Sequence, residues 1–345
     1  MASHRLLLIG FGNVGQGLAQ ILRDQSEMLA RQFDAQFKIV AICDSIKGNV
    51  HNSMGLSPAA LLDAIKMDGH LKNLSGVKPD WDAFQAIKEC DADIVVELSN
   101  TDLKTGQPAL AHLRAALERG KHIVTTNKGP IALHYGELAK RARAHGVILG
   151  IEGTVMSGTP SLRLGHELLS AAGIRRIQGI LNGTTNYILS RMEQGATYAA
   201  ALAEAQKEGY AEADPTGDVE GYDAAAKVVI LSHIMFGAAL TMNQVKRTGI
   251  TGLTPKDIEQ AKGNRERWKM IGSLERVGGE IAASVAPVRL SVDHPLASVS
   301  GATNAITFTT ELLGDVTLIG PGAGRVQTGY AIITDLLSID HSNCR

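Results

Sequence analysis

Cysteine is scarce in this sequence. Of the 345 residues only three are cysteines, Cys43, Cys90 and Cys344. Their number is odd and their spacing fits no zinc-binding pattern, which argues against a disulfide framework and against a structural zinc site. We therefore expect two buried thiols and one exposed thiol in the tail, in a chain that works in a reducing compartment.

The sequence also lacks an excess of one charge and has few aromatic residues. Its 34 basic residues are balanced by 35 acidic residues, and aromatic residues make up 4% of the chain. Nucleic acids and anionic membranes select basic patches, and single-stranded nucleic acid also needs aromatic side chains for stacking. We therefore expect neither nucleic acid nor a membrane as a main partner.

Long hydrophobic runs are missing as well. No segment approaches the length of a membrane span, and the apolar run Leu6–Ile9 is too short for the core of a signal peptide. A buried first strand explains this run better. The protein is therefore expected to be soluble and cytoplasmic.

The first half of the chain alternates short apolar runs with amphipathic stretches. The expected strands are Leu6–Gly10, Lys38–Cys43, Asp93–Leu98, His122–Thr125 and Val147–Ile151. The expected helices are Val14–Gln32, Pro58–Met67, Gly106–Glu118 and Leu133–His145. Continuous apolar strands that alternate with helices predict an α/β fold of the Rossmann type, with a doubly wound parallel sheet covered on both faces.

The second half is first helical and then strand-like. The expected helices are Thr184–Glu193, Tyr198–Glu208, Tyr222–Phe236, Thr254–Lys262 and Gly324–Ile339. The expected antiparallel strands are Trp268–Val277, Ile281–Leu290, Ala305–Leu312 and Asp315–Ile319. Because Gly129-Pro130 is a turn signal, we expect a dinucleotide-binding domain over residues 1–130 and a second, α+β domain over residues 131–321.

A glycine-rich loop joins the first expected strand to the first expected helix. It consists of Gly10, Phe11, Gly12, Asn13, Val14 and Gly15. The first glycine allows a tight turn, the second lets the backbone approach a pyrophosphate, and the third lets helix and strand pack closely. Free N–H groups at the start of the helix favour phosphate. The loop therefore predicts that NAD or NADP binds here.

Asp44 ends the second expected strand. A carboxylate at this place can accept hydrogen bonds from the adenosine ribose hydroxyls and repel a 2′-phosphate, which favours NAD over NADP. Asp44 lies somewhat further along the chain than is usual, and Lys47 is close by. An aspartate that only caps its own loop explains the position equally well, so both interpretations stay open.

The richest pattern lies in residues 205–227, where a carboxylate-rich loop separates two expected helices. Asp223 and Lys227 are four residues apart and therefore lie on one face of the second helix. A surface ion pair would be worth little. However, residues 224–231 are apolar apart from Lys227, so the helix is expected to be buried. A buried lysine beside carboxylates is suited to general acid–base catalysis.

The same stretch resembles the signature of homoserine dehydrogenases. That signature reads A-x-x-x-G, an aromatic and a small residue, then D-P-x-x-D, an aliphatic residue and x-G-x-D-x-x-x-K, and every specified position is filled. The resemblance extends over almost the whole chain. It includes the glycine loop and the segments Thr125–Lys128, Glu152–Val155, Asn182–Tyr187 and Gly320–Gly324.

The resemblance implies an NAD(P)-dependent oxidoreductase that interconverts L-homoserine and L-aspartate 4-semialdehyde in threonine and methionine biosynthesis. Lys227 would be the proton donor and acceptor, held by Asp223. Lys128 would assist near the nicotinamide and the reacting oxygen. Asp218 would position the substrate and the catalytic lysine.

The resemblance also implies binding residues. Glu212, with Asp218, would anchor the substrate ammonium, and Thr184 would line the substrate pocket with Thr185 and Asn186. Ser99 and Gly322 would contact the cofactor, and Gly322 is expected to open the last helix. A sodium ion is expected on backbone carbonyls of Glu152, Val155, Ser157 and Thr159.

On the same resemblance, the helix over residues 322–345 would complete the nucleotide domain, and residues 131–321 would form a catalytic and dimerisation domain of a homodimer. Many relatives continue into a regulatory domain. The chain ends at Arg345, so we expect a short form without end-product inhibition through such a domain.

Three other functions compete with this one. A dehydrogenase acting on aspartate itself would use the amine rather than the alcohol, and the complete signature argues against it. A phosphorylating semialdehyde dehydrogenase would need a nucleophilic cysteine in a substrate loop, whereas Cys43 and Cys90 lie in the nucleotide half and Cys344 in the tail. A catalytically silent nucleotide sensor could lose both lysines, but Lys128 and Lys227 are present.

Overall fold

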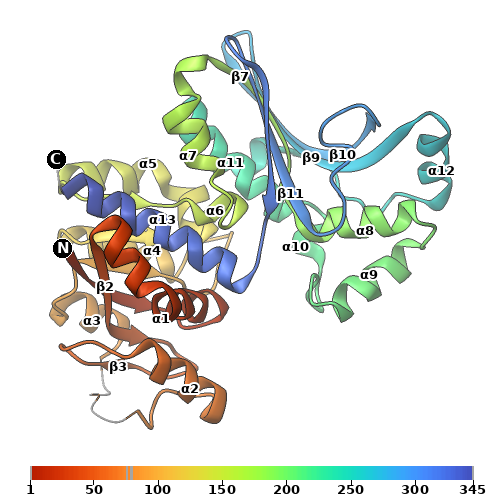
Figure 1. The fold of residues 1–345 in the computed structure, drawn as a ribbon. Coiled ribbons are helices and arrows are strands. Elements are labelled where there is room, and N and C mark those ends of the chain that lie inside the picture. Colours follow the sequence, from red (N-terminus) through yellow and green to blue (C-terminus); the bar gives the residue numbers. More distant parts are fainter. Residues whose placement is uncertain (1, 75–76, 78–80, 344–345) are drawn as a thin grey trace. The chain divides into compact units, whose positions relative to one another are not determined.

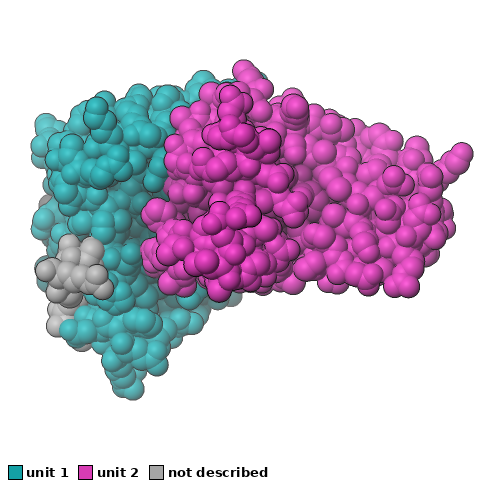
Figure 2. All heavy atoms as spheres, turned by 90° about the horizontal axis from the view of Figure 1, so that it is seen from above, with its two compact units in different colours: residues 1–158, 324–345 teal, residues 159–323 magenta. Residues whose placement is uncertain are grey.

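The computed structural model describes residues 2–74, 77 and 81–343. The chain forms two compact units, unit 1 with residues 1–158 and 324–345 and unit 2 with residues 159–323, which Figure 2 shows in separate colours. In the described part, no helix combines the length and apolar character needed to cross a membrane. Cys344, the expected tail thiol, lies outside the described residues.

Unit 1 is built on a six-stranded sheet with the order β3-β2-β1-β4-β5-β6. Its strands are β1 (Ala2–Ile9), β2 (Ala35–Cys43), β3 (Val50–His51), β4 (Ile94–Glu97), β5 (His122–Thr125) and β6 (Leu149–Gly150). All neighbours are parallel except β2 and β3. The strand order reverses at β1, and ligands of such sheets bind at the carboxyl ends of the strands beside this switch point. The expected Rossmann-type architecture is confirmed.

The helices of unit 1 lie between these strands and after unit 2. They are α1 (Asn13–Phe33), α2 (Pro58–Asp68), α3 (Ala83–Glu89), α4 (Ala109–Glu118), α5 (Lys128–Ala144), α6 (Gly153–Met156) and α13 (Arg325–Asn343). The expected helices are present, whereas α3, α6 and the two-residue strand β3 were not foreseen. All three are too short to leave a clear period in the sequence.

Helix α13 packs against α1, although the two are far apart in the sequence (Figure 1). Glycine makes this close approach possible. A Cβ on Gly17 would lie 1.9 Å from the carbonyl oxygen of Arg325, and one on Gly329 would lie 2.6 Å from the carbonyl carbon of Gly17.

The compact units divide at positions that differ from the boundary expected near residue 130. Strand β6 pairs with β5 and so extends the first sheet, and α5 and α6 belong to the same unit. Unit 1 therefore continues to Gly158. The chain returns to it at Gly324 rather than at residue 322.

Unit 2 contains a second six-stranded sheet, with the order β12-β11-β7-β9-β10-β8. Its strands are β7 (Ile174–Ile180), β8 (Lys246–Arg247), β9 (Glu266–Val277), β10 (Glu280–Ser291), β11 (Thr303–Thr310) and β12 (Gly314–Pro321). The four long antiparallel strands are as expected. Strand β7 was not foreseen, because its short alternating run lies among helices, yet it pairs with both β9 and β11.

The main helices of unit 2 also agree with expectation. They are α8 (Gly183–Glu193), α9 (Tyr198–Lys207), α11 (Tyr222–Phe236) and α12 (Pro255–Gly263), with the shorter α7 (Ser161–Arg163) and α10 (Thr216–Val219). Every residue of α11 from Ala224 to Ser232 is buried, including Lys227. The α+β character of the second unit is therefore confirmed, and α11 is a core helix.

Candidate active site

The glycine loop follows β1 and opens α1. Gly10 has a φ of +99°, and a Cβ there would lie 2.5 Å from the carbonyl oxygen of Leu98. A Cβ on Gly15 would lie 2.9 Å from the carbonyl oxygen of Gly10, whereas one on Gly12 would meet no atom within 4 Å. Gly12 is the N-cap of α1 and makes no side-chain cap. Gly12 therefore leaves free space beside helix N–H groups that no side chain caps, and this arrangement suits a pyrophosphate.

Asp44 is hydrogen-bonded to both its own loop and the glycine loop. Its Oδ1 accepts from the backbone N–H groups of Ile46 (2.9 Å) and Lys47 (2.8 Å), and its Oδ2 accepts from that of Phe11 (2.6 Å). Burial tends to raise the pKa of Asp44, but these hydrogen bonds outweigh it and the pKa is lowered. The capping role is therefore present, and a carboxylate's roughly four acceptor sites leave room for one further donor.

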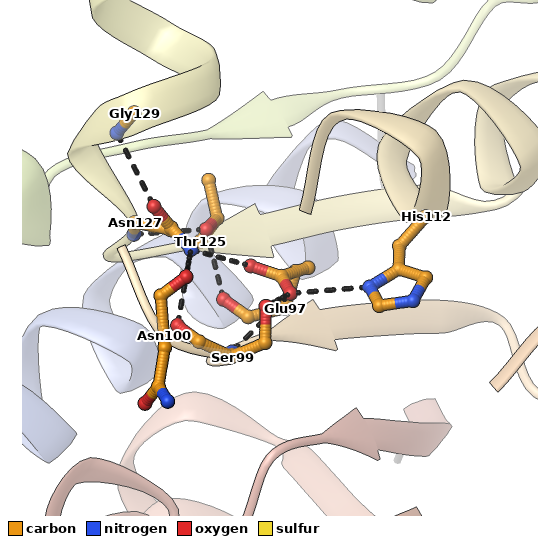
Figure 3. Close-up of polar contacts among 7 residues, drawn as sticks. All are labelled: Glu97, Ser99, Asn100, His112, Thr125, Asn127 and Gly129. Carbon is orange, nitrogen blue, oxygen red and sulfur yellow. Dashed lines mark hydrogen bonds and ion pairs between the residues drawn. The ribbon is translucent and has the colours of Figure 1, made fainter. Parts of the chain in front are cut away.

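A buried carboxylate at the end of β4 contacts Ser99, one of the expected cofactor contacts of unit 1 (Figure 3). Glu97 is fully buried. Its Oε1 accepts from the backbone N–H of Ser99 (3.2 Å) and from the Ser99 hydroxyl, and it lies 3.3 Å from Nδ1 of His112. Its Oε2 accepts from Nδ2 of Asn127 (3.3 Å). Ser99 is thus held through its backbone and its side chain.

Lys128, half-buried, is the first residue of α5. The preceding Asn127 is the N-cap, and its Oδ1 accepts from the backbone N–H of Gly129 at 3.2 Å. A Cβ on Gly129 would lie 2.3 Å from the carbonyl oxygen of Asp102, so the first turn is closely packed. These contacts fix the backbone from which the Lys128 side chain extends.

The acid–base cluster expected from the signature is assembled in unit 2. Nζ of Lys227 lies 2.8 Å from Oδ2 of Asp223 and donates to the carbonyl oxygen of Leu181 at 2.6 Å. Lys227 is only 6% exposed. Nδ2 of Asn182 donates to Asp218 Oδ1 (2.6 Å) and to Asp223 Oδ2 (3.1 Å). One amide therefore joins the two carboxylates that were expected to act together.

The electrostatics of this cluster disfavour a second negative charge. The pKa of Asp218 is raised, first by burial and then by the nearby carboxylate of Asp223. Such a group gains from a cation, because a positive charge favours the ionised form. The cluster is therefore suited to an ammonium-bearing substrate.

The residues of α8 divide into two groups. Thr184, which is buried, donates its hydroxyl to the carbonyl oxygen of Tyr210 at 2.6 Å. Thr185 and Asn186 are fully buried. The Thr185 hydroxyl donates to the carbonyl oxygen of Asn182 at 3.0 Å, and the Asn186 amide donates to three backbone carbonyls, those of Val299, Gly301 and Thr303. Both side chains thus hold the scaffold together.

Among the hydrogen bonds of the described residues, those around Lys227 include neither Glu212 nor Gly322. Glu212 is exposed on the loop after α9, and its backbone carbonyl accepts from Nε2 of Gln206 at 3.0 Å. Gly322 precedes α13 rather than opening it. A Cβ on Gly322 would lie 2.1 Å from Cγ of the buried Asn304, so the residue must be glycine for this packing.

The four expected cation-binding residues are all buried, and Thr159 begins unit 2 whereas the other three belong to unit 1. Ser157 has a φ of +54°, a backbone conformation uncommon outside glycine and one found at ligand-binding turns. Its hydroxyl is 2.7 Å from that of Thr328. Within the described residues, no group of three or more His, Cys, Asp and Glu side chains could hold a metal ion.

The two cysteines that the structure describes are unsuited to nucleophilic chemistry. Cys43 and Cys90 are buried free thiols, and burial raises the pKa of Cys43 to about 12. A thiol with so high a pKa is almost wholly protonated at neutral pH. This argues against a semialdehyde dehydrogenase with a covalent cysteine intermediate.

Three residues that organise the site were not assigned a role from the sequence. Asn182 and Asn127 each cap a helix and bind a carboxylate, and Glu97 connects the loops of unit 1. An asparagine directly before an expected helix is an N-cap signal. A glutamate that ends an apolar strand is a buried charge, which needs partners. Both signals are visible in the sequence, but neither identifies the partner.

Comparison with known proteins assigns both units to one family. A family model described as "Homoserine dehydrogenase, NAD binding domain" matches residues 10–152. A second model, described as "Homoserine dehydrogenase", matches residues 160–337.

Relatives and solved structures agree. The chain is 47% identical to an NAD(+)-dependent homoserine dehydrogenase of Pseudomonas canavaninivorans, covering 100% of this chain and 98% of that one. It is 39% identical to the homoserine dehydrogenase of Methanocaldococcus jannaschii, covering 98% of both. A hyperthermophilic archaeal homoserine dehydrogenase mutant in complex with NADPH matches with a TM-score of 0.85 at 30% identity, over 99% of this chain and 98% of that chain.

Proposed function

The chain belongs to the homoserine dehydrogenase family, and on that premise we propose how its residues interconvert L-homoserine and L-aspartate 4-semialdehyde. As a member of the family it is an NAD(P)-dependent oxidoreductase of amino-acid biosynthesis. The observation that carries the residue assignment is the buried pair of Lys227 and Asp223, joined through Asn182 to Asp218.

Unit 1 supplies the residues that would hold NAD or NADP. The open face at Gly12 and the N–H groups at the start of α1 would receive the pyrophosphate. Asp44 would meet the adenosine ribose, and Ser99 and Lys128 would contact the nicotinamide end. Gly322 of unit 2 is a further cofactor contact in this proposal. The bound cofactor would exchange a hydride with the carbon that carries the reacting oxygen.

Unit 2 supplies acid–base chemistry and substrate binding. Toward the alcohol, the Lys227 ammonium stabilises negative charge on the aldehyde oxygen and transfers a proton to it. In the oxidative direction, neutral Lys227 accepts that proton, and Asp223 holds the lysine throughout. Asp218 and Glu212 bind the substrate ammonium, and Thr184 lines the pocket. Such proton transfer typically contributes about 10²–10⁴ in rate.

An assay of the purified protein tests this function. It follows the absorbance of the reduced nicotinamide with L-homoserine and either NAD or NADP, and uses L-aspartate as the control substrate. Homoserine-dependent reduction of the cofactor, with none on aspartate, is the expected result. Intact cofactor binding without turnover of homoserine would contradict the proposal and favour another substrate or a sensor.

A sodium ion and a homodimer complete the proposal. The positive φ of Ser157 supports a turn that presents carbonyls to an ion. We expect sodium to raise the melting temperature more than potassium does at equal ionic strength. Exposed apolar side chains on the second sheet, Val288 and Ile319, support a contact between copies. Light scattering should give twice the chain mass.

A cytoplasmic location is likewise part of the proposal. It is supported by the two free buried thiols, Cys43 and Cys90, which suit a reducing compartment. Cell fractionation should place the protein with cytoplasmic markers.

A further inference from the structure

Glu97 is a fully buried carboxylate whose contacts lead to the proposed cofactor residues. A buried charge is stable only when it is paired and hydrogen-bonded. Nδ1 of His112 in α4, a residue that is itself 6% exposed, lies 3.3 Å from Oε1 of Glu97. The remaining contacts come from two loops at the carboxyl ends of β4 and β5, the end of a Rossmann sheet at which ligands bind.

The contacts require an acceptor on both carboxylate oxygens. Oε1 faces the backbone N–H and hydroxyl of Ser99, and Oε2 faces Nδ2 of Asn127 (Figure 3). The Asn127 amide cannot exchange the positions of its oxygen and nitrogen, because its Oδ1 caps α5 by accepting from the Gly129 N–H. An ionised carboxylate accepts on both oxygens, whereas a glutamine donates on one side. The site is therefore specific for a carboxylate.

The same contacts connect two segments that the proposed function uses together. Nδ2 of Asn127 also lies 3.0 Å from the carbonyl oxygen of Ser99 and 3.3 Å from that of Asn100. Glu97 and Asn127 thus tie the loop after β4 to the first turn of α5, where Lys128 begins. A change at Glu97 would move both segments, because its carboxylate contacts Ser99 and Asn127 directly.

We propose that Glu97, held between His112 and Asn127, is a positioning residue that keeps Ser99 and the start of α5 in the arrangement that receives the nicotinamide end of the cofactor. This inference rests on the cofactor-binding role proposed for Ser99 and Lys128. It assigns Glu97 no direct contact with cofactor or substrate.

The test is the variant Glu97→Gln, which keeps the size of the side chain and removes one acceptor and the charge. A matched control is Asp340→Asn. Asp340 and His4 form another buried His–carboxylate pair of unit 1, with Nε2 and Oδ1 2.7 Å apart. His4 lies near the amino end of β1, away from the carboxyl ends of the strands. Both variants break a buried pair in one unit.

Three quantities are measured for each full-length variant: the Kd for NADH by nucleotide fluorescence without substrate, kcat with homoserine, and the melting temperature. For Glu97→Gln we expect kcat to fall about tenfold or more, because small misplacements of reacting groups are costly, and NADH to bind several-fold more weakly. For Asp340→Asn we expect a lower melting temperature with unchanged Kd and kcat.

A folded Glu97→Gln protein with wild-type Kd and kcat overturns the inference, as do equal losses in Asp340→Asn. If Glu97→Gln does not fold, His112→Gln decides, since it removes the imidazole that contacts Glu97 and leaves every proposed cofactor contact in place. It should weaken NADH binding in the same direction, and an unchanged Kd would again overturn the inference. Because NADH binding needs no substrate, inactivity of the wild type on homoserine would remove the proposed reaction but leave the comparison of Kd values, which then decides alone.

Discussion

The ammonium nitrogen of Lys227 lies 2.8 Å from Oδ2 of Asp223, on the preceding turn of the buried helix α11. This geometry predicts that Lys227→Ala lowers kcat by about 10²–10⁴, the usual contribution of a general acid–base. The Kd for NADH should stay near its wild-type value, because the glycine loop belongs to unit 1. Steady-state kinetics and nucleotide fluorescence measure the two quantities.

Lys269 provides a control for the loss of a buried lysine. It is fully buried in the same unit, and its Nζ donates to the carbonyl oxygen of Val299 at 2.8 Å. Lys269→Met should lower the melting temperature and leave the kcat of the folded protein within a few-fold of wild type. If both lysine variants lost activity equally, the assignment of Lys227 as the acid–base would fail.

The glycines of the nucleotide loop should differ in what they tolerate. Gly12→Ala adds a Cβ that meets no protein atom within 4 Å, so the melting temperature should hardly change while NADH binding weakens. Gly10→Ala places a Cβ 2.5 Å from the Leu98 carbonyl oxygen at a φ of +99°, so it should destabilise the fold. Thermal melts and NADH titrations of both variants check this. Normal NADH affinity in Gly12→Ala would mean that no ligand approaches its open face.

Features encoded by neighbouring residues could be predicted from the sequence. The glycine loop and the pair of Asp223 and Lys227 depend on spacing along one strand–helix unit or one helix, and both are found as expected. Strand β7 could not be recognised, since its partners β9 and β11 lie far along the chain. A strand forms only when it pairs with other strands, and a short run among helices does not show which strands those are.

The same limit applies to the candidate site. Nothing in the sequence shows that Asn182 joins Asp218 to Asp223, because these residues are brought together only when α8, α10 and α11 pack. Glu97 could be recognised as a buried charge, but its partners His112 and Asn127 come from α4 and from the start of α5. Long-range hydrogen bonds need the packing of the elements, which a single sequence does not give.

Asp44 gives a prediction about cofactor choice. Asp44→Ala should weaken NAD more than NADP, because it removes an acceptor for the ribose hydroxyls and a charge that repels a 2′-phosphate. The same change removes the hydrogen bonds to Ile46, Lys47 and Phe11, so a lower melting temperature is also expected. Dissociation constants for both cofactors measure the ratio. An unchanged ratio in a destabilised variant would leave Asp44 as a loop cap alone.

The raised pKa of Asp218 predicts that its ionised form lowers the stability of the fold while it serves substrate binding. Its pKa is raised by burial and by Asp223, so the folded state binds the proton more tightly than the unfolded chain does. The stability from this group is therefore full below the pKa of an unfolded aspartate and is lost as the pH rises through the raised value. Near neutral pH the ionised carboxylate destabilises the fold, and Asp218→Asn should relieve that cost. Its amide oxygen can still accept from Asn182.

We therefore expect Asp218→Asn to be more stable than the wild type at about pH 7, with the difference shrinking toward about pH 4, where aspartate becomes protonated. The KM for homoserine should rise, because the variant lacks the charge that would bind the substrate ammonium. Denaturant unfolding at both pH values and steady-state kinetics give the two results. If the variant were less stable near neutral pH, the ionised form of Asp218 would be favoured by the fold itself, and the site would not need a cationic substrate to balance it.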